Sequence, residues 1–329
     1  MAAHSSEIEA TDIGSTAAGG AASEDPLRFG VVRLFLNPSG KACAANSVVA
    51  CLAWMMLLAG GFVYEQWRCG FELMRNVVHH SLIPLDLMRH DPFAWLLFGE
   101  WSIERFLTRQ QDATEFCDYL LHLTQPKFLN CLWDIRPSYV DGLDSVHLAH
   151  EKGRQFTPIK LPFIDIHADS SFLQELVDAW HDNQGLCRAA TEVGKQIILS
   201  IDRHVDIASF TCSQRVDCPR NQILMPHFCN SDGDITHAPM ELCGVIFHLG
   251  ASPHTGHYRA GLRHNGNWLL YEDGRIPDKV SELPDWVCRN SVLLWFVQPS
   301  ASAVRTLETA GEAFRTIYTS PNPMQHARW

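Results

Sequence analysis

The stretch Leu242–Asp273, LCGVIFHLGASPHTGHYRAGLRHNGNWLLYED, contains three apolar runs separated by glycine, proline and asparagine. Such runs, bounded by turn-forming residues, predict three β-strands. The connections between them are short, so we expect antiparallel pairing. His257 opens the second predicted strand, and two carboxylates, Glu272 and Asp273, close the third. This stretch therefore combines a predicted sheet with residues that can transfer protons.

Similar β-like runs occur on both sides of this stretch. They read QFTPIKLPFIDI from residue 155, QIILSIDRHVDI from residue 196 and SVLLWFVQ from residue 291. Between the first two, Ser171–Trp180 (SFLQELVDAW) has the apolar spacing of a short amphipathic helix.

The N-terminal part of the chain has helical patterns instead. Ala44–Ala59 is predicted as an apolar helix with the following Gly-Gly pair as its C-cap. Further on, Phe116, Leu120 and Leu123 recur at spacings of three and four, which buries one face of a second helix. A helical first part followed by a mostly antiparallel β second part predicts the α+β class.

Length and composition predict one large folded domain with two loose ends. The 329 residues are 46% hydrophobic, enough to bury a sizeable core. Residues 1–28 are rich in Ala, Gly, Ser and acids, and we expect a disordered leader there. Residues 299–329 lack sustained periodicity and are expected to form a flexible tail, which leaves 29–298 as the domain.

Charge and cysteine usage exclude several classes of protein. Only 26 basic residues face 37 acidic ones, for a net charge of -11, which argues against a nucleic-acid-binding protein. The eleven cysteines are an odd number and no signal peptide precedes them, so we expect reduced thiols and a cytoplasmic or nuclear location. The longest apolar run, Val48–Tyr64, is shorter than the roughly 20 residues of a membrane span, so no membrane partner is expected.

A cysteine and a distant histidine supply the candidate chemistry. Cys43 lies between a turn and the start of an apolar helix, where the helix dipole favours the attacking thiolate. A nucleophilic cysteine needs a base within reach and a third group that orients this base. His257 with Glu272 or Asp273 meets this need, because paired antiparallel strands bring such ends together. Gly256 lets backbone or substrate approach closely.

Three separated segments resemble the ubiquitin-specific protease family. The family's cysteine box is echoed by Leu36, Asn37, Gly40, Cys43, Asn46 and Ser47. Its Gln-Gln-Asp-Ala-x-Glu-Phe helix is matched by Gln110, Gln111, Asp112, Ala113, Glu115 and Phe116. Its histidine box is matched by Gly256, His257, Tyr258, Ala260, Trp268, Glu272 and Asp273. The segments follow the family's order.

This resemblance implies a papain-like cysteine protease fold, with a helical thumb over about 29–125 and an antiparallel β palm with shortened fingers over about 126–298. It also implies a deubiquitinating hydrolase that cleaves after the C-terminal Gly-Gly of ubiquitin, with Cys43 as nucleophile and His257 as base. Ubiquitin or ubiquitinated proteins are then the partners. Substrate binding falls, by the same resemblance, to Gln111, Asp112, Glu115, Phe116, Gly256 and Tyr258.

The cysteine box departs from the family pattern. The family's oxyanion-stabilising Asn lies five residues before the nucleophile, where this chain has Pro38, with Asn37 one step earlier. Proline offers neither a side-chain donor nor an N–H group. Either Asn37 reaches the site, or backbone N–H groups near Cys43 stabilise the oxyanion. Glu272 also stands where Asp or Asn is typical, which leaves Asp273 as an alternative partner of His257.

Many relatives hold zinc in the fingers with two Cys-x-x-Cys pairs, but this chain contains none. We therefore expect no metal and no cofactor. Two other functions stay open. Pro38 and Glu272 motivate a catalytically impaired ubiquitin-binding relative, and the short fingers motivate a protease for a ubiquitin-like modifier.

Overall fold

The computed structural model describes the segments that build the sheet and the candidate site. They are residues 40–58, 110–124, 132–137, 158–162, 169–183, 186–192, 196–205, 210–211, 214–229, 235–252, 255–273, 275 and 277–299. The predicted leader, Asn37, Pro38, the Gly-Gly cap and the predicted tail after residue 299 lie outside these segments.

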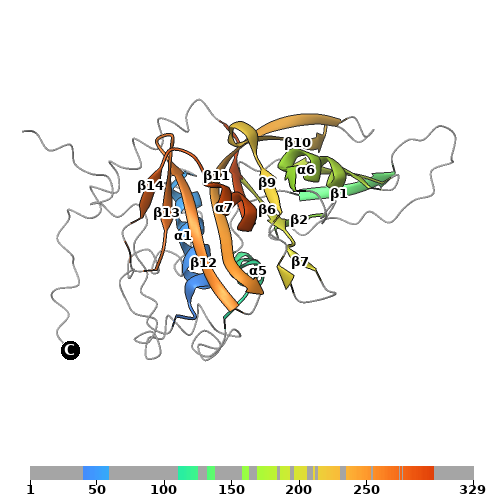
Figure 1. Cartoon of the computed structure of the whole chain (residues 1–329). Coiled ribbons are helices and arrows are strands. Elements are labelled where there is room, and N and C mark those ends of the chain that lie inside the picture. The colour runs from blue at the N-terminus through green and yellow to red at the C-terminus, as the bar shows by residue number, and fades with distance from the viewer. Residues whose placement is uncertain are drawn as a thin grey trace, which may run out of the picture. The chain divides into compact units, whose positions relative to one another are not determined.

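A large, mainly antiparallel sheet dominates the described part of the chain (Figure 1). Seven of its eleven strands follow the order β1-β5-β10-β11-β12-β13-β14, and the others attach to this path. The strands are β1 (Leu132–Pro137), β2 (Ile159–Leu161), β4 (Asp182–Asn183), β5 (Leu186–Glu192), β6 (Gln196–Ile201), β10 (Gln222–Phe228), β11 (Ile235–Ser252), β12 (Thr255–His264), β13 (Asn267–Tyr271), β14 (Asp278–Val280) and β15 (Ser291–Val297).

Strand β11 connects the parts of this sheet because it pairs with three neighbours along its 18 residues. Its first part pairs with β10, its middle with β15 and its end with β12, all antiparallel. The β12 register places His248 opposite Tyr258 and Leu249 opposite His257. This pairing fixes where the candidate base lies.

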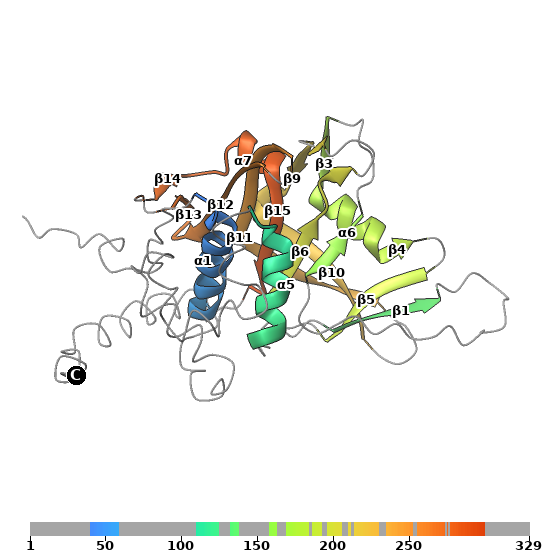
Figure 2. The same cartoon turned by 90° about the horizontal axis from the view of Figure 1, so that it is seen from below.

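Two helices cover one face of the sheet. Helix α1 (Cys43–Leu58) packs against β11 and β12, and α5 (Ala113–Thr124) packs beside it against β15 (Figure 2). Because α1 contains no charged residue and is apolar all round, it is stable only when buried. Gln196 of β6 anchors its far end by donating a 2.9 Å hydrogen bond to the carbonyl of Met55.

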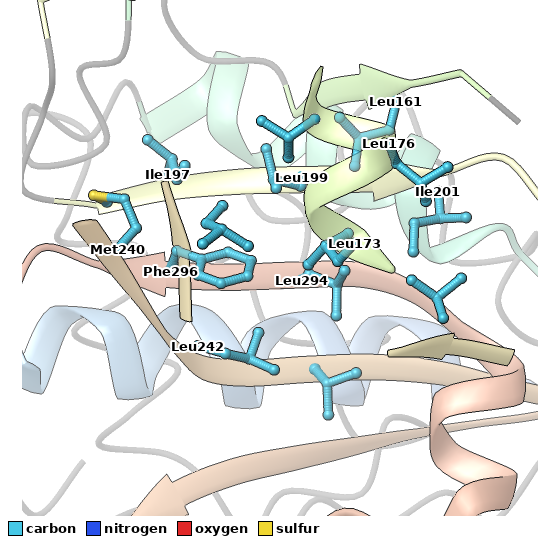
Figure 3. Packing of buried hydrophobic residues seen from close by; sticks show 14 of the residues in the cluster. Leu161, Leu173, Leu176, Ile197, Leu199, Ile201, Met240, Leu242, Leu294 and Phe296 are labelled. Carbon is cyan, nitrogen blue, oxygen red and sulfur yellow. The ribbon is translucent and has the colours of Figure 1, made fainter. Parts of the chain in front are cut away.

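Two further helices cover the opposite face. Helix α6 (Leu173–His181) packs against β2, β5 and β10, and α7 (Asp285–Asn290) packs against β11. Figure 3 shows Leu176 of α6 near Leu199 of β6 and Leu173 of α6 near Leu294 of β15, all buried in one hydrophobic cluster. Each fully buried leucine contributes about 1.5–3 kcal/mol to folding, so this cluster is a main source of stability.

Short elements complete the described fold. Strands β3 (Ser170–Phe172) and β9 (Arg215–Asp217) pair parallel, and β7 (His204–Val205) and β8 (Phe210–Thr211) pair antiparallel. A 3-10 turn, η6, spans Pro219–Asn221.

The α+β prediction is confirmed, and its helices and main strands lie close to the predicted boundaries. The helix predicted from Ala44 is α1, which begins at Cys43. The helix predicted from Ser171 is α6, which starts only at Leu173, and Ser171 belongs to strand β3 instead. Strands β5 and β10 and helix α7 were not predicted from the sequence. Strand β10 contains Pro226, which weakens the β pattern, and α7 is only six residues long.

Candidate active site

Cys43 is the first residue of α1 and its side chain is fully buried. Burial raises the pKa of the Cys43 thiol above its ordinary value. A backbone hydrogen bond from Tyr258 opposes this effect, the charge of Asp273 adds to it, and backbone groups of Ala44 and Cys43 itself lower the pKa. Because the raised pKa keeps the resting thiol protonated, attack by Cys43 requires a base.

His257 lies on β12. It directly precedes Tyr258, whose backbone forms a hydrogen bond with the Cys43 sulfur. Its Nε2 atom is 3.8 Å from Oε1 of Glu272, the residue after the end of β13. This distance is longer than a hydrogen bond, and Nε2 of His257 has no hydrogen-bond partner among the described residues. The carboxylate of Glu272 therefore faces the imidazole at a distance beyond that of a hydrogen bond.

Asp273 faces α1 instead of His257. Its Oδ1 atom accepts a 2.7 Å hydrogen bond from Nδ2 of Asn46, which lies one turn after Cys43 on α1. Consecutive side chains after an extended strand point in different directions. The two carboxylates thus have separate neighbours, an imidazole for Glu272 and an amide for Asp273.

Tyr258 and His248 pack against each other beside His257. Their rings lie 4.4 Å apart on paired strands, and Nε2 of His248 is 3.1 Å from Nε2 of Gln110, before α5. Gly256 adopts φ +147°, and a Cβ atom there would come within 2.6 Å of His248 Nε2. This close approach requires glycine immediately before His257.

The start of α5 presents one exposed acid and one capping acid. Oδ1 of Asp112 accepts hydrogen bonds from the backbone N–H groups of Thr114 at 2.6 Å and Glu115 at 3.1 Å, as an N-cap does. Glu115 is exposed, whereas Phe116 is fully buried and stacks against Tyr119. Asp112 therefore helps to fold α5, and Glu115 is the acid open to a partner.

The structure brings most of the predicted site residues to the junction of α1, α5, β12 and the end of β13. Of the residues predicted to bind substrate, Glu115 and Gly256 are exposed and Asp112 is half-buried, whereas Gln111, Phe116 and Tyr258 are buried. Asn37 lies outside the described residues.

Sequence reasoning assigned no role to Asn46 or Arg259. Asn46 had two available signals, because it matches the family's cysteine box and lies one helical turn after Cys43. Arg259 had another, because it follows His257 by two residues on the same strand face.

Two structural observations concern other classes of site. Among the described residues, no three His, Cys, Asp or Glu side chains converge so that they could hold a metal ion. No helix in the described part of the chain is long and apolar enough to cross a membrane.

Comparison with known proteins identifies the family. A family model described as ubiquitin carboxyl-terminal hydrolase matches residues 36–296. No curated protein matches the chain.

Several solved structures share the fold. The SAGA DUB module of Ubp8, Sgf11, Sus1 and Sgf73 bound to monoubiquitin matches with a TM-score of 0.60 and 16% identity, over 83% of this chain and 70% of that chain. The same module bound to ubiquitin aldehyde matches with a TM-score of 0.58, 16% identity and the same coverage. A yeast SAGA DUB module with a variant Sgf73 gives 0.57 and 16%, again over 83% and 70% of the two chains.

Proposed function

The chain belongs to the ubiquitin carboxyl-terminal hydrolase family, and we propose that it is a thiol-dependent deubiquitinase with Cys43 as nucleophile and His257 as base. The observation that carries this proposal is that α1, β12 and the end of β13 meet at the site. Cys43 at the start of α1 lies against the backbone of Tyr258, and the adjacent His257 faces the carboxylate of Glu272.

In the proposed reaction, His257 takes the thiol proton as Cys43 Sγ bonds to the carbonyl carbon of the last glycine of ubiquitin. The tetrahedral intermediate collapses, the C–N bond breaks, and His257 returns the proton to the leaving amine. Water then attacks the thioester, again with His257 as base, and releases the ubiquitin carboxylate and the free thiol. Backbone N–H groups at the start of α1 are suitable donors to the oxyanion.

We assign different roles to the two neighbouring acids, Glu272 and Asp273. Glu272 orients His257 and stabilises its protonated form, whereas Asp273 holds Asn46 and thereby the first turn of α1. The site geometry favours Glu272 over Asp273 as the partner of the base, because Glu272 approaches the imidazole whereas Asp273 accepts a hydrogen bond from Asn46.

We propose ubiquitin as the substrate because related Ubp8 modules have been solved with monoubiquitin and with ubiquitin aldehyde. The exposed Glu115 is placed to pair with basic groups of the substrate tail. We still expect this protein to have no membrane or nucleic-acid partner and to be located in the cytoplasm or nucleus.

A ubiquitin probe with a C-terminal electrophile tests this function. We expect the wild type to be labelled, Cys43→Ala not to be labelled, and Cys229→Ala to be labelled like the wild type, because Cys229 is exposed and directly follows β10, which is not one of the elements of the site. Ubiquitin binding without labelling would replace this proposal by a non-catalytic ubiquitin-binding protein. Labelling only by a probe made from another modifier would change the substrate class.

A further inference from the structure

His257 and Arg259 meet the same carboxylate from one face of β12. The two residues are two positions apart on the strand, so their side chains share a face. Glu272 presents Oε1 to Nε2 of His257 and Oε2 to Nη2 of Arg259, both at 3.8 Å. The solvent-exposed Arg275 also approaches Oε2, at 3.4 Å. The two carboxylate oxygens of Glu272 therefore have different neighbours.

Arg259 itself is held by aromatic rings. Its guanidinium lies 5.6 Å from the ring centre of Trp286 on α7 and 5.9 Å from that of Phe247 on β11. These two rings meet edge to face, 5.2 Å apart, and the Arg259 side chain is only 13% exposed. A cation packed against two aromatic rings has few alternative positions. Nη2 of Arg259 also approaches Oδ2 of Asp278 at 3.5 Å.

The burial of Arg259 is costly for the fold. Its Nε–H group is buried and has no acceptor among the described residues. A buried donor without an acceptor has lost its hydrogen bond to water, and such groups call for an explanation other than stability. The neighbouring carboxylate of the candidate catalytic acid supplies one.

We propose that Arg259 is a positioning residue, which holds Oε2 of Glu272 so that Oε1 faces His257. This inference rests on the proposed function. A glutamate side chain has one more rotatable bond than an aspartate, so Glu272 needs an additional contact to keep its carboxylate on the imidazole. Arg275 contributes less to this restraint, because its side chain is 73% exposed and its ion pair is screened by water.

A double-mutant cycle on kcat tests the inference. Arg259→Met removes the charge but keeps an apolar side chain against the aromatic rings. We expect kcat for a ubiquitin-fluorophore substrate to fall by about tenfold or more, with KM nearly unchanged, because a misplaced catalytic group lowers the rate of the chemical step. In a Glu272→Ala background, Arg259→Met should cause no further loss. Arg259→Lys, which keeps the charge, should recover part of kcat.

Arg263→Met is the matched control. Arg263 lies on the same strand and pairs with Glu241 at 3.6 Å, away from His257. We expect this variant to keep the wild-type kcat. Arg259→Lys also serves as the second variant if Arg259→Met folds poorly in a thermal melt.

The outcomes separate the two proposals. An equal loss of kcat in the presence and absence of Glu272, or a loss confined to KM, would overturn the positioning role of Arg259 alone. Wild-type kcat in Arg259→Met would do the same. A wild type without Cys43-dependent hydrolysis would overturn the proposed function and this inference with it.

Discussion

Nδ2 of Asn46 donates a 2.7 Å hydrogen bond to Oδ1 of Asp273, across 227 positions of sequence. The bond joins the first turn of α1, which carries Cys43, to the residue that follows Glu272. The nucleophile and the acid behind the base are therefore fixed to each other by one polar contact.

This contact should be worth measurable stability. Asn46→Ala deprives a half-buried carboxylate of a donor, so we expect the free energy of unfolding in urea to fall by about 1–3 kcal/mol. Asp273→Ala in the same protein should then add little, because the two side chains are coupled. Asn267→Ala, which removes a hydrogen bond in an exposed turn, should have a smaller effect. Additive losses for Asn46 and Asp273 would contradict the coupling.

The two neighbouring acids should differ in their effect on catalysis. Glu272→Gln removes the charge that faces His257, and we expect kcat to fall by about 10² or more. Asp273→Asn keeps an oxygen that can accept from Asn46, so its kcat should fall much less. Steady-state hydrolysis of a ubiquitin-fluorophore substrate measures both. A larger loss for Asp273→Asn than for Glu272→Gln would reverse the assignment.

Two glycines with positive φ allow a matched test of the close approach beside the base. At Gly256, with φ +147°, a new Cβ would lie 2.5 Å from the carbonyl oxygen of Leu249. At Gly266, with φ +75°, a new Cβ would meet nothing within 4 Å. We expect Gly256→Ala to lose probe labelling and more than about 2 kcal/mol of stability, and Gly266→Ala to lose about 1 kcal/mol with labelling kept. Similar losses at both glycines would mean that backbone strain, and not the clash, decides.

The acids of α5 should separate folding from substrate binding. Asp112→Asn keeps the N-cap, whereas Asp112→Ala loses it at a cost of about 1 kcal/mol of stability. Glu115→Gln should leave the melting temperature unchanged and weaken ubiquitin binding, because its carboxylate is exposed. Calorimetric titration with ubiquitin, in a Cys43→Ala background, measures this binding. Unchanged affinity in Glu115→Gln would remove Glu115 from the proposed substrate contact.

The buried thiols predict a loss of stability in alkali. Burial raises the pKa of Cys51, of Cys117 and of Cys243 above the ordinary value of 9.0. These thiols ionise more readily in the unfolded chain, so their stabilising effect is complete below about pH 9 and is lost as the pH rises above it. Urea unfolding on both sides of that pH should show the decline. Cys51→Ala should make it shallower, and replacing the exposed Cys229 should not.

The sequence predicted the parts of the site that depend on local order. Cys43 starts a helix because an apolar, charge-free segment follows it, and His257 opens a strand because a glycine-bounded apolar run follows. The choice between Glu272 and Asp273 could not be made this way. It depends on which side of the last strand each side chain leaves, and on α1 supplying Asn46 from the other end of the chain.

The strands of the sheet likewise differ in whether a local sequence pattern could predict them. Strands with continuous apolar runs, such as β6 and β15, were predictable, whereas β5 (LCRAATE) mixes charged and small residues. Strand β5 forms because β1 and β10 supply its hydrogen-bond partners, and such partners are not visible in a local pattern. The proposed domain boundaries at residues 29 and 298 remain predictions.

The apolar surface of α1 has a consequence for synthesis of the chain. Asp273, which fixes the first turn of this helix through Asn46, is made 227 positions after Asn46. At about 5–20 residues per second, that interval lasts about 10–45 s. During it, a helix without a single charge has neither β11 nor β12 to cover it. Its apolar surface therefore stays open to contacts between incompletely folded chains until β11 and β12 have been made.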